Sequence, residues 1–95
     1  MTEGCAEDLE ATVNETVRLL MARTGKRQAD VAAALGVTRC AVSSRFLGRV
    51  EWKLSDLPKV ADCFGLTASE LLSGYTAIAA AGRLPPTGPI RTRVA

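Results

Sequence analysis

The sequence predicts an all-α fold of five helices, organised around a central pair of helices joined by a short turn. Apolar residues recur at intervals of three and four over most of the first 74 residues, the spacing of one helix face. The chain has one Trp, one Tyr and two Phe, so its core must consist mainly of Ala, Val and Leu, which suits packed helices. We expect a single domain over residues 1–74, followed by an Ala-rich segment and a flexible tail containing Pro and Arg over residues 75–95.

The first helix is predicted over residues 6–24 and is interpreted as scaffold. Acidic residues near its start lie where the helix dipole favours negative charge, and Gly25 ends it. Its apolar stripe comprises Leu9, Val13, Val17, Leu20 and Met21.

Residues 27–48 predict a helix-turn-helix, the unit that places a helix in the DNA major groove. The second helix begins near Arg27 or Gln28, and Gly36 can adopt a positive φ in the turn at low cost. Thr38 is a suitable N-cap for a third helix over residues 39–47, and Gly48 ends it. The inward residues of this pair are Val31, Ala32, Leu35, Val42 and Phe46.

Four residues share the outer face of the third helix near its start and are predicted to contact DNA bases. Arg39 can donate to O6 and N7 of guanine, whereas serines are short donors or acceptors with little base preference. Cys40 is small and apolar enough to rest on a thymine methyl group; a redox role for this thiol is a less favoured alternative. The set is Arg39, Cys40, Ser43 and Ser44.

A second set is predicted to contact DNA phosphates. Arg27 stands where Ser or Thr would cap the second helix better, and its charge opposes the helix dipole. A phosphate bound at this helix start would explain that choice, although an ordinary exposed loop is the alternative. The set is Lys26, Arg27, Gln28, Thr38, Arg45, Arg49 and Lys53.

Two further helices complete the predicted core. Ser55 is the expected N-cap of the fourth, which carries Leu57, Val60, Ala61 and Phe64 and ends at Gly65. The fifth begins with a capping box, Thr67-Ala68-Ser69-Glu70, flanked by Leu66 and Leu71 as a hydrophobic staple. Leu71 and Leu72 are expected to close the core, and Trp52 to cover it as a lid.

The pattern weakens after Tyr75. Residues 76–81 could add one or two helical turns that dock Ile78, and the prolines that follow predict a mobile tail. The arginines of this tail, Arg83, Arg91 and Arg93, could contact phosphates or simply be solvated.

Charge is distributed unevenly along the chain. Residues 1–17 contain five acidic residues and no basic ones, whereas residues 18–53 contain eight basic and two acidic residues. The basic block coincides with the helix-turn-helix, and such clustering favours a polyanionic partner.

Composition excludes several other classes. The chain has no histidine, which excludes His-based catalysis and Cys/His zinc sites. Its three cysteines are widely spaced and predict reduced thiols. No run approaches the length of a membrane span, and we expect a cytoplasmic protein of a bacterial cell, without metal or cofactor.

The residues quoted above resemble the Cro/C1-type helix-turn-helix family of phage and bacterial regulators, with the lambda-repressor-like fold. The resemblance runs from about Leu9 to Leu72, and the spacing of Gln28, Gly36 and Gly48 carries it. It implies a phosphate contact from Gln28 and base contacts from the four outer residues of the third helix. Arg27 departs from the usual small cap, and Arg45 replaces a residue that is aliphatic in many members.

The leading hypothesis is a sequence-specific transcription regulator, a repressor or Cro-like protein from a phage or mobile element. It would bind double-stranded operator DNA as a homodimer, with no small-molecule effector. The alternatives are an antitoxin or adaptor module on the same scaffold and a recombination directionality factor. An enzyme is disfavoured because the sequence lacks paired acids, a nucleophile–base set or a phosphate-binding glycine loop.

Overall fold

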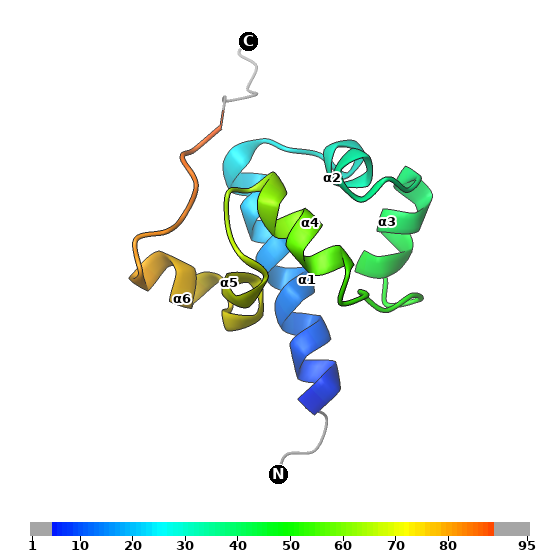
Figure 1. Ribbon diagram of the computed structural model, residues 1–95, viewed down its shortest axis with the longest axis horizontal. Helices are drawn as coiled ribbons and strands as arrows, with labels where there is room; N and C mark the ends of the chain where they lie inside the picture. The colour runs from blue at the N-terminus through cyan, green and yellow to red at the C-terminus, as the bar shows by residue number, and fades with distance from the viewer. Residues whose placement is uncertain (1–4, 89–95) are drawn as a thin grey trace.

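The computed structural model describes the backbone of residues 5–88 and the side chains of residues 9–88, and this part of the chain contains helices and no strands (Figure 1). The all-α class predicted from the sequence is confirmed. The helices are α1 (Cys5–Thr24), α2 (Gln28–Leu35), α3 (Arg39–Phe46), α4 (Asp56–Cys63), α5 (Ala68–Ser73) and α6 (Tyr75–Ala80).

Helix α1 is the long central element of the fold. Figure 1 shows α2 and α3 to one side of it and α5 and α6 to the other, with α4 between the two groups. Val17, Leu20 and Leu71 are among the fully buried side chains where these helices meet. Burying each such side chain contributes about 1.5–3 kcal/mol. The helices are too short to persist alone, so this shared core stabilises them.

Most of the local signals were correctly interpreted. Gly36 adopts φ 74° between α2 and α3, and the Thr38 hydroxyl accepts from the Ala41 amide at 3.1 Å. The capping box of α5 is present, since Glu70 N donates to Thr67 Oγ1 at 3.2 Å and Thr67 N donates to Glu70 Oε1 at 2.9 Å. Ser55 does occupy the N-cap position of α4, but its side chain makes no capping bond.

Two leucines that we expected in the core are on the surface. Leu9 is 50% exposed and Leu72 is 37% exposed, whereas the neighbouring Val13 and Leu71 are buried. Both predictions were wrong because periodicity shows which side of a helix is apolar. It does not show whether another element packs over that side at each position.

The described residues after α6, 81–88, contact the rest of the protein, and the mobility that we expected of the tail stays a prediction. Gly88 N donates to Arg23 O at 2.8 Å, Arg23 Nε donates to Pro85 O, and Leu84 packs against the core. The expected extra turns are α6, whose Ile78 is buried. Residues 75–88 therefore pack against the unit formed by residues 5–74; Arg91 and Arg93 lie outside the described residues.

Candidate nucleic-acid interface

Helix α3 presents the predicted base-contacting residues on the side away from the core. Val42 and Phe46 are buried, which leaves Arg39 and Cys40 exposed at the start of the helix. Ser43 and Ser44 are half-buried on the next turn. The α3 residues thus form a surface with one long cation, one thiol and two hydroxyls. Their contact with DNA bases remains a prediction.

The start of α2 combines a helix end with cationic side chains. Arg27 is the N-cap residue, and a guanidinium has no acceptor atom with which to cap amides. Its own amide donates to the Asp30 carboxylate at 2.8 Å, which leaves the amides of Gln28 and Ala29 as the unpaired first-turn donors of α2. Lys26 and Gln28 are half-buried beside them, and Arg27 is exposed.

Arg45 is the one predicted phosphate-contacting residue whose side chain the structure places in the interior, and we correct that prediction. Its Nε lies 3.0 Å from Asp56 Oδ2, and its Nη1 donates to Ala41 O at 2.9 Å. Asp56 Oδ2 also accepts from the Lys53 amide at 3.0 Å. The guanidinium therefore joins α3 to the start of α4. The buried Asp56 carboxylate therefore supplies the negative partner of Arg45 that we had expected to be a DNA phosphate.

The eight basic residues of the segment 18–53 divide into two groups. Arg18, Arg23 and Arg45 donate to groups of the protein itself. For the other five, the described part of the chain supplies no side-chain hydrogen bond or ion pair. Those five, namely Lys26, Arg27, Arg39, Arg49 and Lys53, are all predicted DNA contacts.

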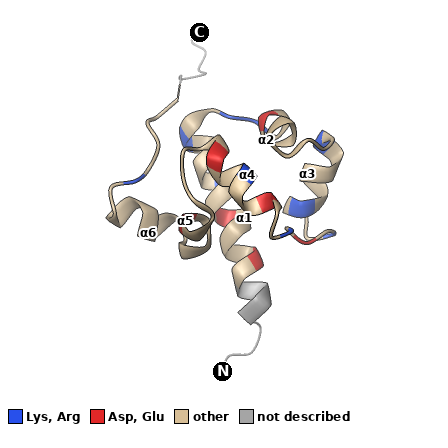
Figure 2. Ribbon diagram, viewed as in Figure 1, with Lys and Arg blue, Asp and Glu red and all other residues tan. Residues whose placement is uncertain are grey.

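These cations lie on one part of the molecule. Figure 2 shows Lys and Arg positions on the connection into α2, on α3 and on the loop that follows α3. Four of the five side chains are exposed, and Lys26 is half-buried. A surface that gathers cations beside a helix with an outward polar face has the charge that a phosphate backbone requires.

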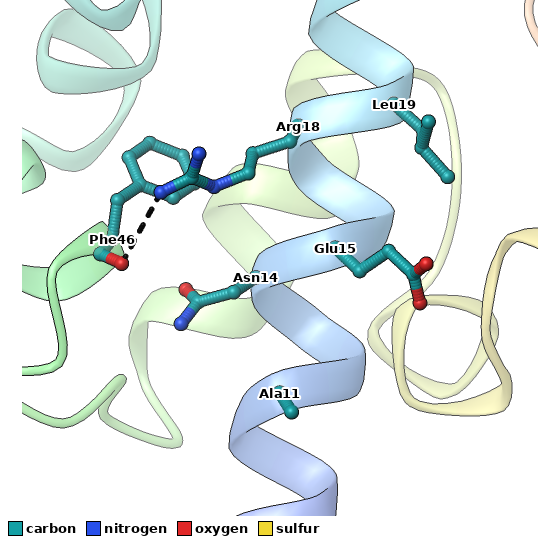
Figure 3. Close-up of a pocket in the computed structure, with 6 residues that line it drawn as sticks. All are labelled: Ala11, Asn14, Glu15, Arg18, Leu19 and Phe46. Atoms are coloured by element: carbon teal, nitrogen blue, oxygen red, sulfur yellow. Dashed lines mark hydrogen bonds between the residues drawn. The ribbon is translucent and has the colours of Figure 1, made fainter.

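Arg18 is a cation whose contacts are made within the protein itself. Its guanidinium carbon lies 5.2 Å from the centroid of the Phe46 ring, and its Nη2 donates to Phe46 O at 3.3 Å (Figure 3). That carbonyl belongs to the last turn of α3, where a positive charge is favourable. The guanidinium borders an open groove of about 530 Å³ between α1 and α3, with Asn14 toward Phe46 and Glu15 and Leu19 turned to the far side.

Trp52 is a lid on the core, as predicted. Its ring is buried and lies edge-on to Phe46, with ring centroids 5.5 Å apart. The indole Nε1 donates to Asn14 Oδ1, and the Trp52 amide donates to Glu10 Oε2 at 3.2 Å. The loop after α3 is thereby fixed against α1, which holds Arg49 and Lys53 near α3.

The sequence interpretation missed the residues that position the site. Asp30 stands three residues after the N-cap Arg27, the spacing of a capping box, so its bond to the Arg27 amide could have been predicted. The partnership of Arg45 with Asp56 had no comparable signal, because the residues lie on different helices.

The cysteines differ in environment. The Cys40 thiol is exposed on α3, whereas Cys63 is half-buried, and burial raises the pKa of its thiol above 9.0. Lys26 opposes this pKa shift and Asp30 adds to it. Among the described residues, no group of three or more His, Cys, Asp or Glu side chains could hold a metal ion. None of the described helices is both long and apolar enough to traverse a bilayer.

Together, the helical fold and the basic α2–α3 surface are those of a small helical domain of the DNA-binding type. A family model described as the BetR domain matches residues 8–91, so the chain belongs to the BetR domain family. This membership indicates a DNA-binding, regulator-like role. Searches of curated proteins and of solved structures found no match.

Proposed function

We propose that this protein is a sequence-specific regulator of the Cro/C1 type that binds double-stranded operator DNA as a homodimer. In this proposal α3 lies in the major groove, with Arg39, Cys40, Ser43 and Ser44 against base edges. The start of α2 and the loop after α3 contact phosphates on either side, which fixes the position of α3 on the duplex.

The observation that carries the proposal is the division of the basic residues. Three arginines of the segment 18–53 are used within the protein, and the five remaining cations lie on the connection into α2, on α3 and on the loop after α3. A structural role accounts for the first group only. Contact with DNA accounts for the second, through phosphates for four residues and through a base for Arg39, because exposed like charges repel one another unless an anion neutralises them.

A repressor from a phage or mobile element is the particular regulator that we propose. A dimer bound across two half-sites about 34 Å apart would block access of polymerase to the promoter. We propose that the function is binding and not catalysis, and that it needs neither a cofactor nor an effector.

Selection of bound duplexes from a random DNA pool, followed by affinity measurements at increasing salt, tests the proposal. We expect symmetric, spaced half-sites, and a log–log salt slope of about −4 per half-site if the four cations other than Arg39 each meet a phosphate. The Lys59→Ala variant is the control for loss of a positive charge, since Lys59 is an exposed cation on α4 that is not among the five proposed contacts. Absence of binding at low salt would favour the adaptor alternative, and binding without sequence preference would favour an architectural protein.

A further inference from the structure

One face of α1 carries three polar side chains that bond to the end of α3 or to the loop after it. They are Glu10, Asn14 and Arg18, which we call the polar strip of α1. Residues four apart on a helix lie on the same face, about 6 Å apart along its axis. Figure 3 shows that Asn14 and Arg18 lie on the side of α1 that faces Phe46. Glu15 turns to the far side.

The polar strip bonds to both ends of the segment 46–52. Arg18 Nη2 donates to Phe46 O, at the last residue of α3, at 3.3 Å. Trp52 N donates to Glu10 Oε2 at 3.2 Å, and Trp52 Nε1 donates to Asn14 Oδ1. These side chains make the link to α1, because an open groove of about 530 Å³ lies between α1 and α3.

The loop after α3 has other bonds only toward its two ends in the described part of the chain. The Arg49 amide donates to a carbonyl of α3 at 2.9 Å, and the Lys53 amide donates to Asp56 Oδ2 at 3.0 Å. The Trp52 amide lies between these two positions, and it donates to Glu10. Helix α1 therefore fixes the part of the loop that lies between the two predicted phosphate contacts.

We propose that the polar strip positions the loop after α3 for DNA binding, so that Arg49 and Lys53 are held where they meet phosphates. This role rests on the proposed function, and the three α1 residues perform it without touching DNA. Its physical basis is conformational entropy. Ordering one residue of a free loop weakens binding by about 5–30-fold, so a loop that α1 has already ordered binds more tightly.

The fluorescence of Trp52 tests the first half of the proposal without DNA. Trp52 is the one tryptophan of the chain and is 7% exposed, so quenching by acrylamide reports whether the loop stays against α1. Asn14→Leu removes the acceptor of the indole N–H, and leucine is the better helix former, so α1 itself should not be weakened. We expect stronger quenching in Asn14→Leu than in the wild type.

Two further variants control that measurement. Asn14→Asp retains an acceptor oxygen for the indole and should restore the wild-type quenching. Glu15→Gln changes the neighbouring α1 residue that turns to the far side, and it should be quenched as the wild type is. Glu10→Leu removes the acceptor of the Trp52 amide and replaces Asn14→Leu if that variant does not fold, which circular dichroism checks.

Fluorescence anisotropy with the selected duplex and with a scrambled duplex tests the role in DNA binding. Asn14→Leu should weaken binding to both duplexes equally, by about tenfold, because it acts through phosphate contacts. Its effect should be coupled to that of Arg49. Arg49→Ala should weaken binding of the wild type and should have a smaller effect in Asn14→Leu. Lys26→Ala, at the start of α2, should weaken both backgrounds by the same factor.

The possible outcomes separate this role from the proposed function. Wild-type quenching in Asn14→Leu, or effects of Asn14→Leu and Arg49→Ala that simply multiply, would overturn the positioning role. Wild-type affinity of Asn14→Leu for both duplexes would also overturn it and would leave the proposed function intact. A wild type that binds neither duplex would refute the proposed function, and the positioning role with it.

Discussion

Arg45 Nε lies 3.0 Å from Asp56 Oδ2, and the two side chains are 7% and 9% exposed. This buried ion pair connects the end of α3 to the start of α4. Asp56 also accepts from the Lys53 amide, so one carboxylate fixes α3 and the loop that carries two of the predicted phosphate contacts. The orientation of the proposed recognition helix therefore depends on a pair within the protein.

Replacing Arg45 with Met should lower the free energy of unfolding by about 3–5 kcal/mol, because it leaves Asp56 buried without its charge partner. The double variant Arg45→Met/Asp56→Leu should lose less than the sum of the two single variants. Urea unfolding measures both quantities. Arg49→Met, an exposed arginine nearby, is the control and should be close to wild type. If Arg45→Met were as stable as that control and reduced the salt slope of DNA binding, Arg45 would be a phosphate contact after all.

Replacing Arg39 with Ala should weaken binding to the selected DNA site by about 1–3 kcal/mol and relax preference at one base pair. Fluorescence anisotropy with the selected duplex and with a scrambled duplex measures both effects. Lys26→Ala should instead weaken binding to both duplexes equally, as expected for a phosphate contact. Equal losses on the two duplexes for Arg39→Ala would contradict its assignment to a base.

DNA should protect Cys40 from alkylation. Because the thiolate is the reactive form and burial raises the pKa of Cys63, iodoacetamide at pH 8 should modify Cys40 before Cys63. The selected duplex should slow modification of Cys40 and leave that of Cys63 unchanged. Mass spectrometry of a Cys5→Ser variant follows the two sites separately. Modification of Cys40 at the same rate with and without bound DNA would remove it from the interface.

Replacing Gly88 with Ala should release the segment after α6. A Cβ atom at this position would lie 1.6 Å from Thr24 O, so the Gly88 amide could not keep its bond to Arg23 O. Loss of that bond should cost about 0.5–1.5 kcal/mol of unfolding free energy and speed exchange of the amide at position 88. Thr87→Ala, at the exposed neighbouring position, is the control. Unchanged exchange in Gly88→Ala would contradict the docked arrangement.

Stability should depend on pH through Glu70. Its hydrogen bond from Arg83 lowers the pKa of the Glu70 carboxyl below 4.5, with a smaller contribution from the Thr67 amide. A carboxyl whose pKa is lower in the folded state stabilises the fold above its unfolded-state pKa, and this is lost as pH falls through the folded-state value. The stability difference between wild type and Glu70→Gln should therefore be present at pH 7 and shrink below pH 4.5.

Thermal unfolding of these two proteins between pH 2 and 7 measures that difference. Arg83→Ala removes the hydrogen-bond partner of Glu70 and should reduce the pH dependence of stability as Glu70→Gln does. A difference between wild type and Glu70→Gln that did not change with pH would show that the charge of Glu70 contributes nothing.

Features that depend on neighbouring residues were correctly predicted from the sequence. Thr67 and Glu70 are three residues apart and satisfy each other's backbone amides, and Gly36 supplies the positive φ of its turn regardless of the rest of the fold. The all-α class, the helix-turn-helix and the outward face of α3 follow from such local signals and from apolar periodicity.

Only the tertiary structure decided which cations belong to the protein and which remain for a partner. Arg45 meets Asp56 across two helices, and Arg23 meets Pro85, 62 residues along the chain. Leu9 and Leu72 likewise follow the apolar pattern but lie on the surface, because no described helix covers them. The sequence sets which side chains a helix presents on each face. Whether a charge on that face is paired, or an apolar group there is buried, depends on the segments that folding brings beside it. Those segments are distant in the sequence, so local spacing does not predict them.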